Sequence, residues 1–281
     1  MLSIIIITKD NKKDLYKTLK SINEEIVKNN FTSKSLEIII VDKSIKYKVK
    51  DLIEEFQNLI DFVSIFYQEK EGIFNAFNIG ILKSNNDWLC FINSGDILLE
   101  NSLFKAFKIV KNNRMHKYNS YIFQSDIYFE DLFLGTKPLS LSNSKKLHKF
   151  CILFPSVFWP CHQAIIFSRE WHLKNLYPEY LIGGDEKIIY KIIDEGNFLF
   201  SSLRFSVSFA NGVSSSVNLS FEKYFLQIKD SLLQGQYRRC FSIFQKIIFK
   251  LLKINDKFAC FMRKIRFSFY IAVFKFLKII I

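Results

Sequence analysis

The 281-residue sequence has few of the residues that build extended or cross-linked proteins. Its 9 glycines and 4 prolines exclude a collagen-like or low-complexity chain. Its 5 cysteines are an odd number without any C-x-x-C pair, so we expect neither a disulfide framework nor a zinc knuckle, and a reducing compartment fits best. Apolar residues make up 49% of the chain, which is enough for one large domain with a substantial core.

The sequence also lacks a long, uninterrupted apolar run. Residues 151–168 carry no charge, but Pro155 and Pro160 interrupt them and His162 lies among them, so a membrane-spanning helix is not expected. Residues 1–8 are apolar but lead directly into Lys9, which favours a strand over an export signal.

Acidic residues are scarce at the C-terminal end. The formal net charge is +13, and residues 238–281 hold eleven basic residues against one acid, Asp256. Lys246, Lys250, Lys253 and Lys257 fall on one face of a predicted helix, a pattern typical of helices that lie on anionic membranes. The alternative is an ordinary helix that caps the domain and exposes its lysines. We expect no nucleic-acid partner, because the remaining 237 residues are nearly neutral.

The pattern of apolar residues alternates between the two periods of secondary structure. Continuous β-branched runs predict strands that are buried on both faces, and apolar residues at helical spacing predict helices between them. The expected strands are 2–8, 36–41, 63–67, 88–92, a pair within 120–135, 164–167 and 198–209, and the expected helices are 14–27, 49–59, 73–83, 103–111 and 185–194. This order predicts an α/β fold with a mixed, mainly parallel sheet flanked by helices.

Polar clusters follow four of the predicted strands. They are residues 8–10, 42–44, 69–72 and 93–96, and open α/β sheets bind their ligands at this edge. No G-x-G-x-x-G follows the first strand and no G-x-x-x-x-G-K-[ST] occurs, which disfavours dinucleotide-binding and P-loop proteins.

Residues 72–81 read GIFNAFNIGI, and residues 88–96 read WLCFINSGD. This block resembles a branch of the family 2 glycosyltransferases of the GT-A fold, whose pattern is G-I-Y-D-A-M-N-x-G-I followed by W-x-x-F-L-N-[SA]-G-D. Residues 161–164, 184–186 and 211–214 are similar to the H-Q, A-D-Y-D and G-G-[IV]-S segments of that branch. The resemblance covers about residues 1–215 and implies a GT-A domain there, with a nucleotide-sugar-binding half (1–100) and an acceptor half (101–215), followed by a basic helical tail (216–281).

The resemblance also implies where the nucleotide sugar binds. Asp42 would contact the base or ribose, although the turn that follows it reads Lys43-Ser44-Ile45 rather than the usual Gly/Ser/Asp-rich sequence. Gly72 would let the backbone approach the ligand. The full set of expected nucleotide-sugar-binding residues is Thr8, Asp10, Asp42, Gly72, Asn78 and Asn93.

A divalent cation, Mn²⁺ or Mg²⁺, usually neutralises the departing diphosphate. Asp96 is the expected metal ligand, as an exposed carboxylate at the end of a strand, and His162 is the second candidate because the family's D-x-D pattern reads Asn-Ser-Gly-Asp here. By resemblance, Asp185 is the general base that takes the proton of the acceptor hydroxyl, with Glu186 as the fallback. The simplest alternative for Asp185 is an acidic residue that stabilises the start of its helix.

The resemblance thus implies an inverting, metal-assisted glycosyltransferase of the hexosyl- or N-acetylhexosaminyl-transferase type. Its donor would be a nucleotide sugar, a UDP-sugar by the resemblance, and its acceptor a saccharide or lipid-linked hydroxyl in surface polysaccharide or lipopolysaccharide assembly. We expect it to be cytoplasmic and peripheral, bound to the inner face of the cytoplasmic membrane through residues 238–281. The alternative is a catalytically inactive scaffold or partner subunit at the membrane.

Overall fold

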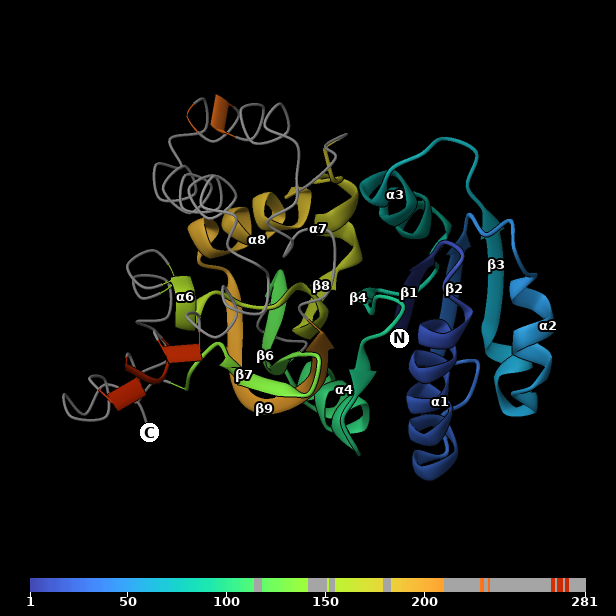
Figure 1. Ribbon diagram of the computed structural model, residues 1–281, viewed down its shortest axis with the longest axis horizontal. Helices are drawn as coiled ribbons and strands as arrows, with labels where there is room; N and C mark the ends of the chain where they lie inside the picture. The colour runs from blue at the N-terminus through green and yellow to red at the C-terminus, as the bar shows by residue number, and fades with distance from the viewer. Residues whose placement is uncertain are drawn as a thin grey trace.

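The computed structural model describes residues 1–113, 118–140, 151, 155–178 and 183–209, with short pieces at 228–229, 232, 264–265, 267–269 and 271–272. The predicted motif at 211–214 and most of the basic tail lie outside the described residues. Within them, the chain forms one mixed sheet with helices on both faces (Figure 1).

The sheet has the strand order β3-β2-β1-β4-β8-β6-β9-β5, with β7 paired to β6. The first four of these strands are parallel, β8 is antiparallel to both of its neighbours, and β6 is parallel to β9. Their bounds are β1 (Leu2–Thr8), β2 (Leu36–Asp42), β3 (Val63–Tyr67), β4 (Trp88–Phe91), β5 (Ile97–Leu98), β6 (Ser120–Phe129), β7 (Leu132–Lys137), β8 (Ile165–Ser168) and β9 (Phe198–Phe209). The predicted mixed, mainly parallel sheet is confirmed.

The helices follow the strands along the chain and return it to the same edge of the sheet. They are α1 (Lys12–Asn29), α2 (Val49–Glu54), η1 (Gln57–Phe62), α3 (Ile73–Lys83), α4 (Ser102–Asn112), α6 (Pro155–Phe158), η4 (His162–Ala164), α7 (Arg169–Leu173) and α8 (Gly184–Glu195).

Two apolar layers hold the helices against the sheet. On one face, α1, α2 and α4 bury residues such as Leu19, Leu52 and Leu103 against alternate residues of the strands. On the other face, α3 and α8 bury Phe77 and Ile192 in the same manner. The alternation of inward-facing residues along each strand sends successive side chains to opposite layers, which is why the parallel strands are apolar throughout. In Figure 1, α3, α7 and α8 lie along the upper side of the sheet.

The single helix predicted for residues 49–59 is wrong, because the chain forms α2 and the 3₁₀ helix η1 there. Phe56 and Leu59 are both buried and lie three residues apart, a spacing that α and 3₁₀ helices share. Apolar spacing therefore could not distinguish the two. The elements β5, α6 and α7 have at most five residues and are too short to show a period.

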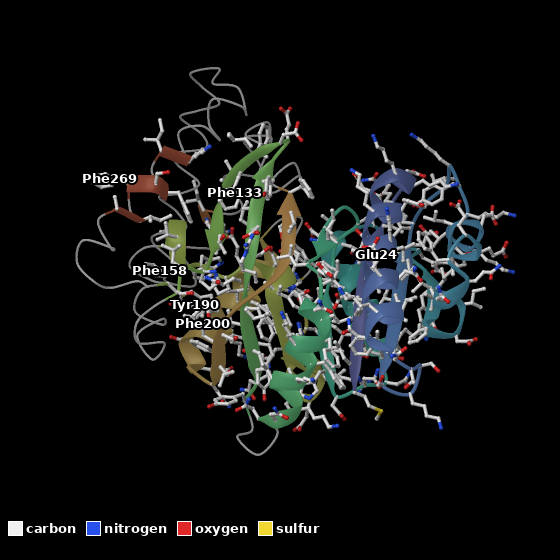
Figure 2. The ribbon with its side chains drawn as sticks, turned by 90° about the horizontal axis from the view of Figure 1, so that it is seen from below. Glu24, Phe133, Phe158, Tyr190, Phe200 and Phe269 are labelled. Carbon is white, nitrogen blue, oxygen red and sulfur yellow. The ribbon has the colours of Figure 1, made fainter. Side chains whose placement is uncertain are left out.

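The described part of the C-terminal tail contacts the domain at one strand. A Cβ placed on Gly135 of β7 would lie 2.1 Å from the ring of Phe267, which is itself buried. Phe269, two residues further on, is 64% exposed and lies at the side of the molecule in Figure 2. Among the described residues, no helix is both long and apolar enough to cross a membrane.

Candidate functional site

The polar clusters that follow β1, β2 and β3 meet at one edge of the sheet. The Asp10 amide donates a 2.9 Å hydrogen bond to Ser44 Oγ, and Lys9 forms a 3.1 Å ion pair with Glu71. The Lys43 ammonium donates to the Glu69 carbonyl oxygen. Because these contacts link three successive strand ends, the expected convergence of these clusters is present in the structure.

A pocket of about 450 Å³ opens beside Asp42, between the β2 end and α2. Asp42 is 1% exposed, and its Oδ1 accepts a 2.7 Å hydrogen bond from the Ser44 amide. Thr8 Oγ1 lies 3.2 Å from Tyr47 Oη, and the ring of Tyr67, which is 69% exposed, lines the same pocket. A buried carboxylate beside one exposed and one half-buried aromatic ring suits a planar, hydrogen-bonding ligand.

Asp10 fastens the loop that forms one wall of this pocket. Its backbone has a left-handed φ of 51°, and its Oδ1 accepts hydrogen bonds of 2.8 Å from the amides of Ile45 and Lys46. These two amides lower the pKa of the Asp10 carboxyl, since they stabilise its ionised form. The short Asp side chain therefore shapes the unusual turn after Asp42.

Gly72 begins α3 with a φ of 124°, a conformation that strains any residue with a Cβ. Its carbonyl oxygen accepts a 2.8 Å hydrogen bond from the Gln68 side chain. Eight residues later, a Cβ on Gly80 would lie 2.4 Å from Ile5 Cγ2 of β1. The two glycines therefore bring the start of α3 to the strand edge and its middle close against the sheet.

The turn after β4 is tied to α1 by Thr18, which sequence reasoning missed. Thr18 Oγ1 accepts a 2.9 Å hydrogen bond from the Gly95 amide and lies 2.8 Å from the Asp96 carbonyl oxygen. The only signal in the sequence is a hydroxyl residue next to Leu19 on the apolar face of a predicted helix. Thr18 therefore fixes the backbone of the 93–96 turn against α1.

Asp96 is not the exposed carboxylate that the sequence led us to expect. It is 5% exposed, and its Oδ1 accepts a long hydrogen bond, 3.4 Å, from the Phe209 amide at the end of β9. Burial raises its pKa to about 7, although nearby amides such as that of Gln163 favour the ionised form. The sequence could not predict this burial, because the residue that covers Asp96 is Phe209 at the end of β9, 113 positions away in the chain.

Three side-chain oxygens in this turn are buried without a hydrogen-bond partner in the described part of the chain: Asn93 Oδ1, Ser94 Oγ and Asp96 Oδ2. Buried polar atoms are normally paired. Hard oxygen donors of this kind suit Mg²⁺ or Mn²⁺, which bind one or two carboxylates together with substrate phosphates. The described residues contain no group of three His, Cys, Asp or Glu side chains placed to hold a metal by themselves. The turn therefore fits a cation that would be coordinated partly by these side-chain oxygens and partly by the oxygens of a bound diphosphate.

The structure does not present His162 as a free ligand beside Asp96. Its ring lies among the rings of Phe77, Phe91 and Phe167, and its Nε2 contacts Tyr177 Oη. Burial lowers the pKa of His162 to about 3, so the imidazole is neutral. The two chain neighbours of His162 interact with Asp96 instead. Gln163 lowers the pKa of Asp96, and the charge of Asp96 raises the pKa of Cys161.

Tyr177 is a second residue that sequence reasoning missed. Its backbone N–H donates to Asn78 Oδ1 and its carbonyl oxygen accepts from Asn78 Nδ2, both at 2.9 Å. Its hydroxyl lies 3.3 Å from Nε2 of the buried His172 and also contacts His162. Asn78 thus holds the segment that leads toward Asp185, and its role toward a nucleotide sugar stays a prediction.

Asp185 lies in the first turn of α8, which packs against the start of α3. A Cβ on Gly184 would lie 2.9 Å from the Phe74 ring, and the rings of Phe74 and Tyr177 stack at 5.7 Å. Burial and the charge of Asp185 both raise the pKa of Tyr177. The structure therefore places the residue before Asp185 against the start of α3, and Glu186 is more exposed than Asp185.

The family model described as Glycosyl transferase family 2 matches residues 3–175 of the chain. Among curated proteins, an uncharacterized glycosyltransferase of Rickettsia bellii is 25% identical over 188 residues, which are 65% of this chain and 25% of the relative. An uncharacterized glycosyltransferase of Haemophilus influenzae is 26% identical over 113 residues, 40% of this chain and 35% of the relative. The chain thus spans about a quarter to a third of these relatives.

Among solved structures, S. aureus TarS 1–349 in complex with UDP-GlcNAc superimposes with a TM-score of 0.61 and 14% identity, covering 86% of this chain and 72% of that one. The complex of the same protein with UDP gives a TM-score of 0.57 and 13% identity, covering 81% and 63%. At these identities the likeness shows the fold, which confirms the expected arrangement of sheet and helices.

Proposed function

The chain belongs to glycosyl transferase family 2, and we propose that it transfers a sugar from a nucleoside diphosphate sugar to a hydroxyl of a saccharide or lipid-linked acceptor. The observation that carries the proposal is the meeting of the Asp42 pocket and the strand ends around it within the part of the chain that matches the family. Fold alone would not support a particular activity.

The pocket beside Asp42 is the proposed site of the nucleoside. Asp42 would accept hydrogen bonds from the base or ribose, and the exposed ring of Tyr67 offers a face for stacking. Thr8 and Asp10 shape the wall of this pocket through Tyr47 and the 45–46 amides. The TarS complexes with UDP and UDP-GlcNAc support a UDP-sugar donor, with a hexosyl or N-acetylhexosaminyl group to be transferred.

The turn at residues 93–96 is the proposed site of the diphosphate end of the donor. Asp96 and Asn93 would hold Mn²⁺ or Mg²⁺, which supplies positive charge to the departing diphosphate. The buried oxygens without partners support this assignment. Asp96 would be ionised when the cation is bound, because a nearby positive charge lowers a carboxyl pKa.

Asp185 is the proposed general base. Its place in the first turn of α8 favours the ionised carboxylate, because the helix N-terminus stabilises negative charge. It would take the acceptor proton while the hydroxyl oxygen attacks the anomeric carbon and the bond to the diphosphate breaks. A single displacement of this kind inverts the anomeric configuration. We place the reaction in surface polysaccharide or lipopolysaccharide assembly at the cytoplasmic membrane face, with the basic tail on the anionic membrane.

Thermal-shift titration of the full chain with UDP, GDP, CDP and dTDP, each with and without Mn²⁺, tests the proposal. We expect one nucleotide to raise the Tm in a Mn²⁺-dependent manner, because a ligand that binds the native state stabilises it by mass action. Asp42→Ala should abolish the shift. Asp61→Ala, which changes an exposed aspartate on η1, is the matched control and should keep it.

The altered turn after Asp42 and the single carboxylate at residues 93–96 favour a second candidate, an inactive scaffold at the membrane. That protein would show no shift with any nucleotide and would release no UDP from UDP-GlcNAc. Absence of every nucleotide shift in the wild-type chain contradicts a working transferase and supports the scaffold, whereas absence of UDP release from UDP-GlcNAc alone excludes that donor.

A further inference from the structure

A second pocket, of about 410 Å³, lies in the other half of the molecule against β6, β7 and β9. Its volume falls in the range of small-ligand sites, about 300–1,000 Å³. It is lined by two aromatic rings, an arginine and short polar side chains, among them Tyr128, Phe133, Thr136 and Arg204. Figure 2 shows Phe133 well away from Glu24 of α1, on the opposite half of the molecule.

The arginine in this pocket is held in place by a buried carboxylate. Arg204 Nε donates to Asp126 Oδ1 at 3.2 Å, and Arg204 Nη2 donates to Oδ2. Thr136 Oγ1 donates to the same Asp126 at 2.6 Å, and Asp126 is only 1% exposed. The pair orients the guanidinium, leaves Nη1 outside the Asp126 contact and offsets the positive charge. The wall is therefore a rigid hydrogen-bond donor without a strong preference for anions.

The aromatic rings supply an apolar face beside these polar groups. Tyr128 and Phe133 lie 5.2 Å apart between centroids, at 53° to each other, and Phe133 is 41% exposed. Covering an exposed ring gains about 25 cal/mol per Å² of apolar surface. A pyranose ring has one face of C–H groups and an edge of hydroxyls, so it matches an aromatic face bordered by neutral hydrogen-bonding groups.

Phe209 of β9 connects this pocket to the proposed diphosphate site. Tyr128 is paired with Phe209 in the β6–β9 register, and their rings lie 6.2 Å apart. The Phe209 amide is the donor to Asp96 Oδ1. A ligand in this pocket would therefore be separated from the 93–96 turn by Phe209, and the pocket shares no lining residue with the nucleoside pocket at Asp42.

We propose that this pocket binds a neutral sugar ring of the acceptor, with the ring face on Phe133 and Tyr128 and its hydroxyls on Arg204 and Thr136. This inference rests on the proposed transferase function, because it names the substrate that would receive the sugar. Nucleotide binding and saccharide binding are measured separately in the test, so that each can fail without the other.

Saturation-transfer NMR on the full chain, with the methyl glycosides of glucose, galactose and N-acetylglucosamine as probes, tests the site. We expect transfer to at least one glycoside, and an affinity at least about tenfold weaker in Phe133→Ala. Tyr16→Ala is the matched control, since Tyr16 lies on α1 with the same 41% exposure, and it should bind like the wild type. Arg204→Lys keeps the charge but loses the fork and should also weaken binding.

Phe133→Ala and Arg204→Lys should both keep the nucleotide-induced Tm shift. The inference is overturned if the wild type binds no glycoside, or if Phe133→Ala and Arg204→Lys bind the glycosides as tightly as the wild type does. This holds even if nucleotides bind. Competition of inorganic phosphate with the glycosides would also overturn it, because it would show an anion site. Glycoside binding that depends on Phe133 without any nucleotide shift would keep the saccharide site and reject the donor assignment.

Discussion

Asp96 and Asp126 are buried on the same sheet, but their surroundings differ. Asp126 accepts hydrogen bonds from Arg204 and Thr136, so its charge is balanced and both of its oxygens are used. The hydrogen bond that Asp96 Oδ1 accepts from the Phe209 amide is long, 3.4 Å, and Asp96 Oδ2 has no partner in the described part of the chain. A paired buried carboxylate organises the fold, whereas an under-paired one is a cost to stability and marks a candidate site.

The largest effect that separates the two aspartates should be on catalysis. Asp96→Asn should lower the rate of sugar transfer by at least about a hundredfold, because a bound cation supplies several kcal/mol of charge stabilisation. The fold should persist, since the amide keeps an oxygen for Phe209 and can donate to Asn93 Oδ1 or Ser94 Oγ. UDP release from UDP-sugar and the Tm measure these two properties. An active Asp96→Asn variant would refute the metal assignment.

The pH dependence of stability should come next in size. Burial raises the pKa of Asp96 from 3.8 to about 7, so the folded state holds this proton at pH values where the unfolded state has lost it. The contribution of Asp96 is fully present below about pH 4 and is lost as the pH rises to about 7. In metal-free buffer, the Tm of the wild type should therefore fall by several degrees across this window relative to Asp96→Asn. If the plots of Tm against pH are parallel for the wild type and Asp96→Asn, the carboxyl group of Asp96 does not have a raised pKa in the folded state.

Removing the charge of Asp126 should affect stability rather than nucleotide binding. Asp126→Asn should lower the free energy of unfolding by about 1–3 kcal/mol, because Arg204 and Thr136 lose a charged acceptor. Urea denaturation measures this loss, and Asp131→Asn on the exposed hairpin is the control. A loss of the nucleotide-induced Tm shift in Asp126→Asn would mean that the two aspartates do not have separate roles.

Glu25 shares one property with each aspartate, and its substitution should change the free energy of unfolding least. Its carboxylate accepts the amides of Asn101 and Leu103 at the start of α4, but burial still raises its pKa. Glu25→Gln should cost about 1 kcal/mol of unfolding free energy, measured by urea denaturation. Glu24→Gln changes the exposed neighbour on the same helix (Figure 2) and should leave stability unchanged. Equal values for the two variants would show that Glu25 does not cap α4.

Much of the fold was predictable because strands and helices depend on the spacing of apolar residues over short stretches of the chain. The apolar runs predicted β1, β2 and β3 and the long strand β9 within a residue of their observed bounds. Their polar ends then follow from the geometry of parallel strands, since all carboxyl ends lie at one edge. The contact between Asp10 and Ser44 is an outcome of that rule.

The candidate site was only partly predictable, because its chemistry depends on residues that are distant in the chain. The clamp between Asn78 and Tyr177 joins positions 99 apart, and the Asp126–Arg204 pair joins positions 78 apart. Neither Tyr177 nor Arg204 belongs to a local pattern, so spacing and periodicity could not select them.

The sequence by itself determined the alternation of strands and helices, the edge at which polar residues gather and the likeness to a family, because these depend on short-range periodicity and on a contiguous motif. Only the tertiary structure decided that Asp96 is buried, that His162 lies among aromatic rings and that Arg204 is fixed by Asp126. Burial and hydrogen-bond partners depend on which distant strand covers a residue, and the covering of the 93–96 turn by the end of β9 is a long-range contact.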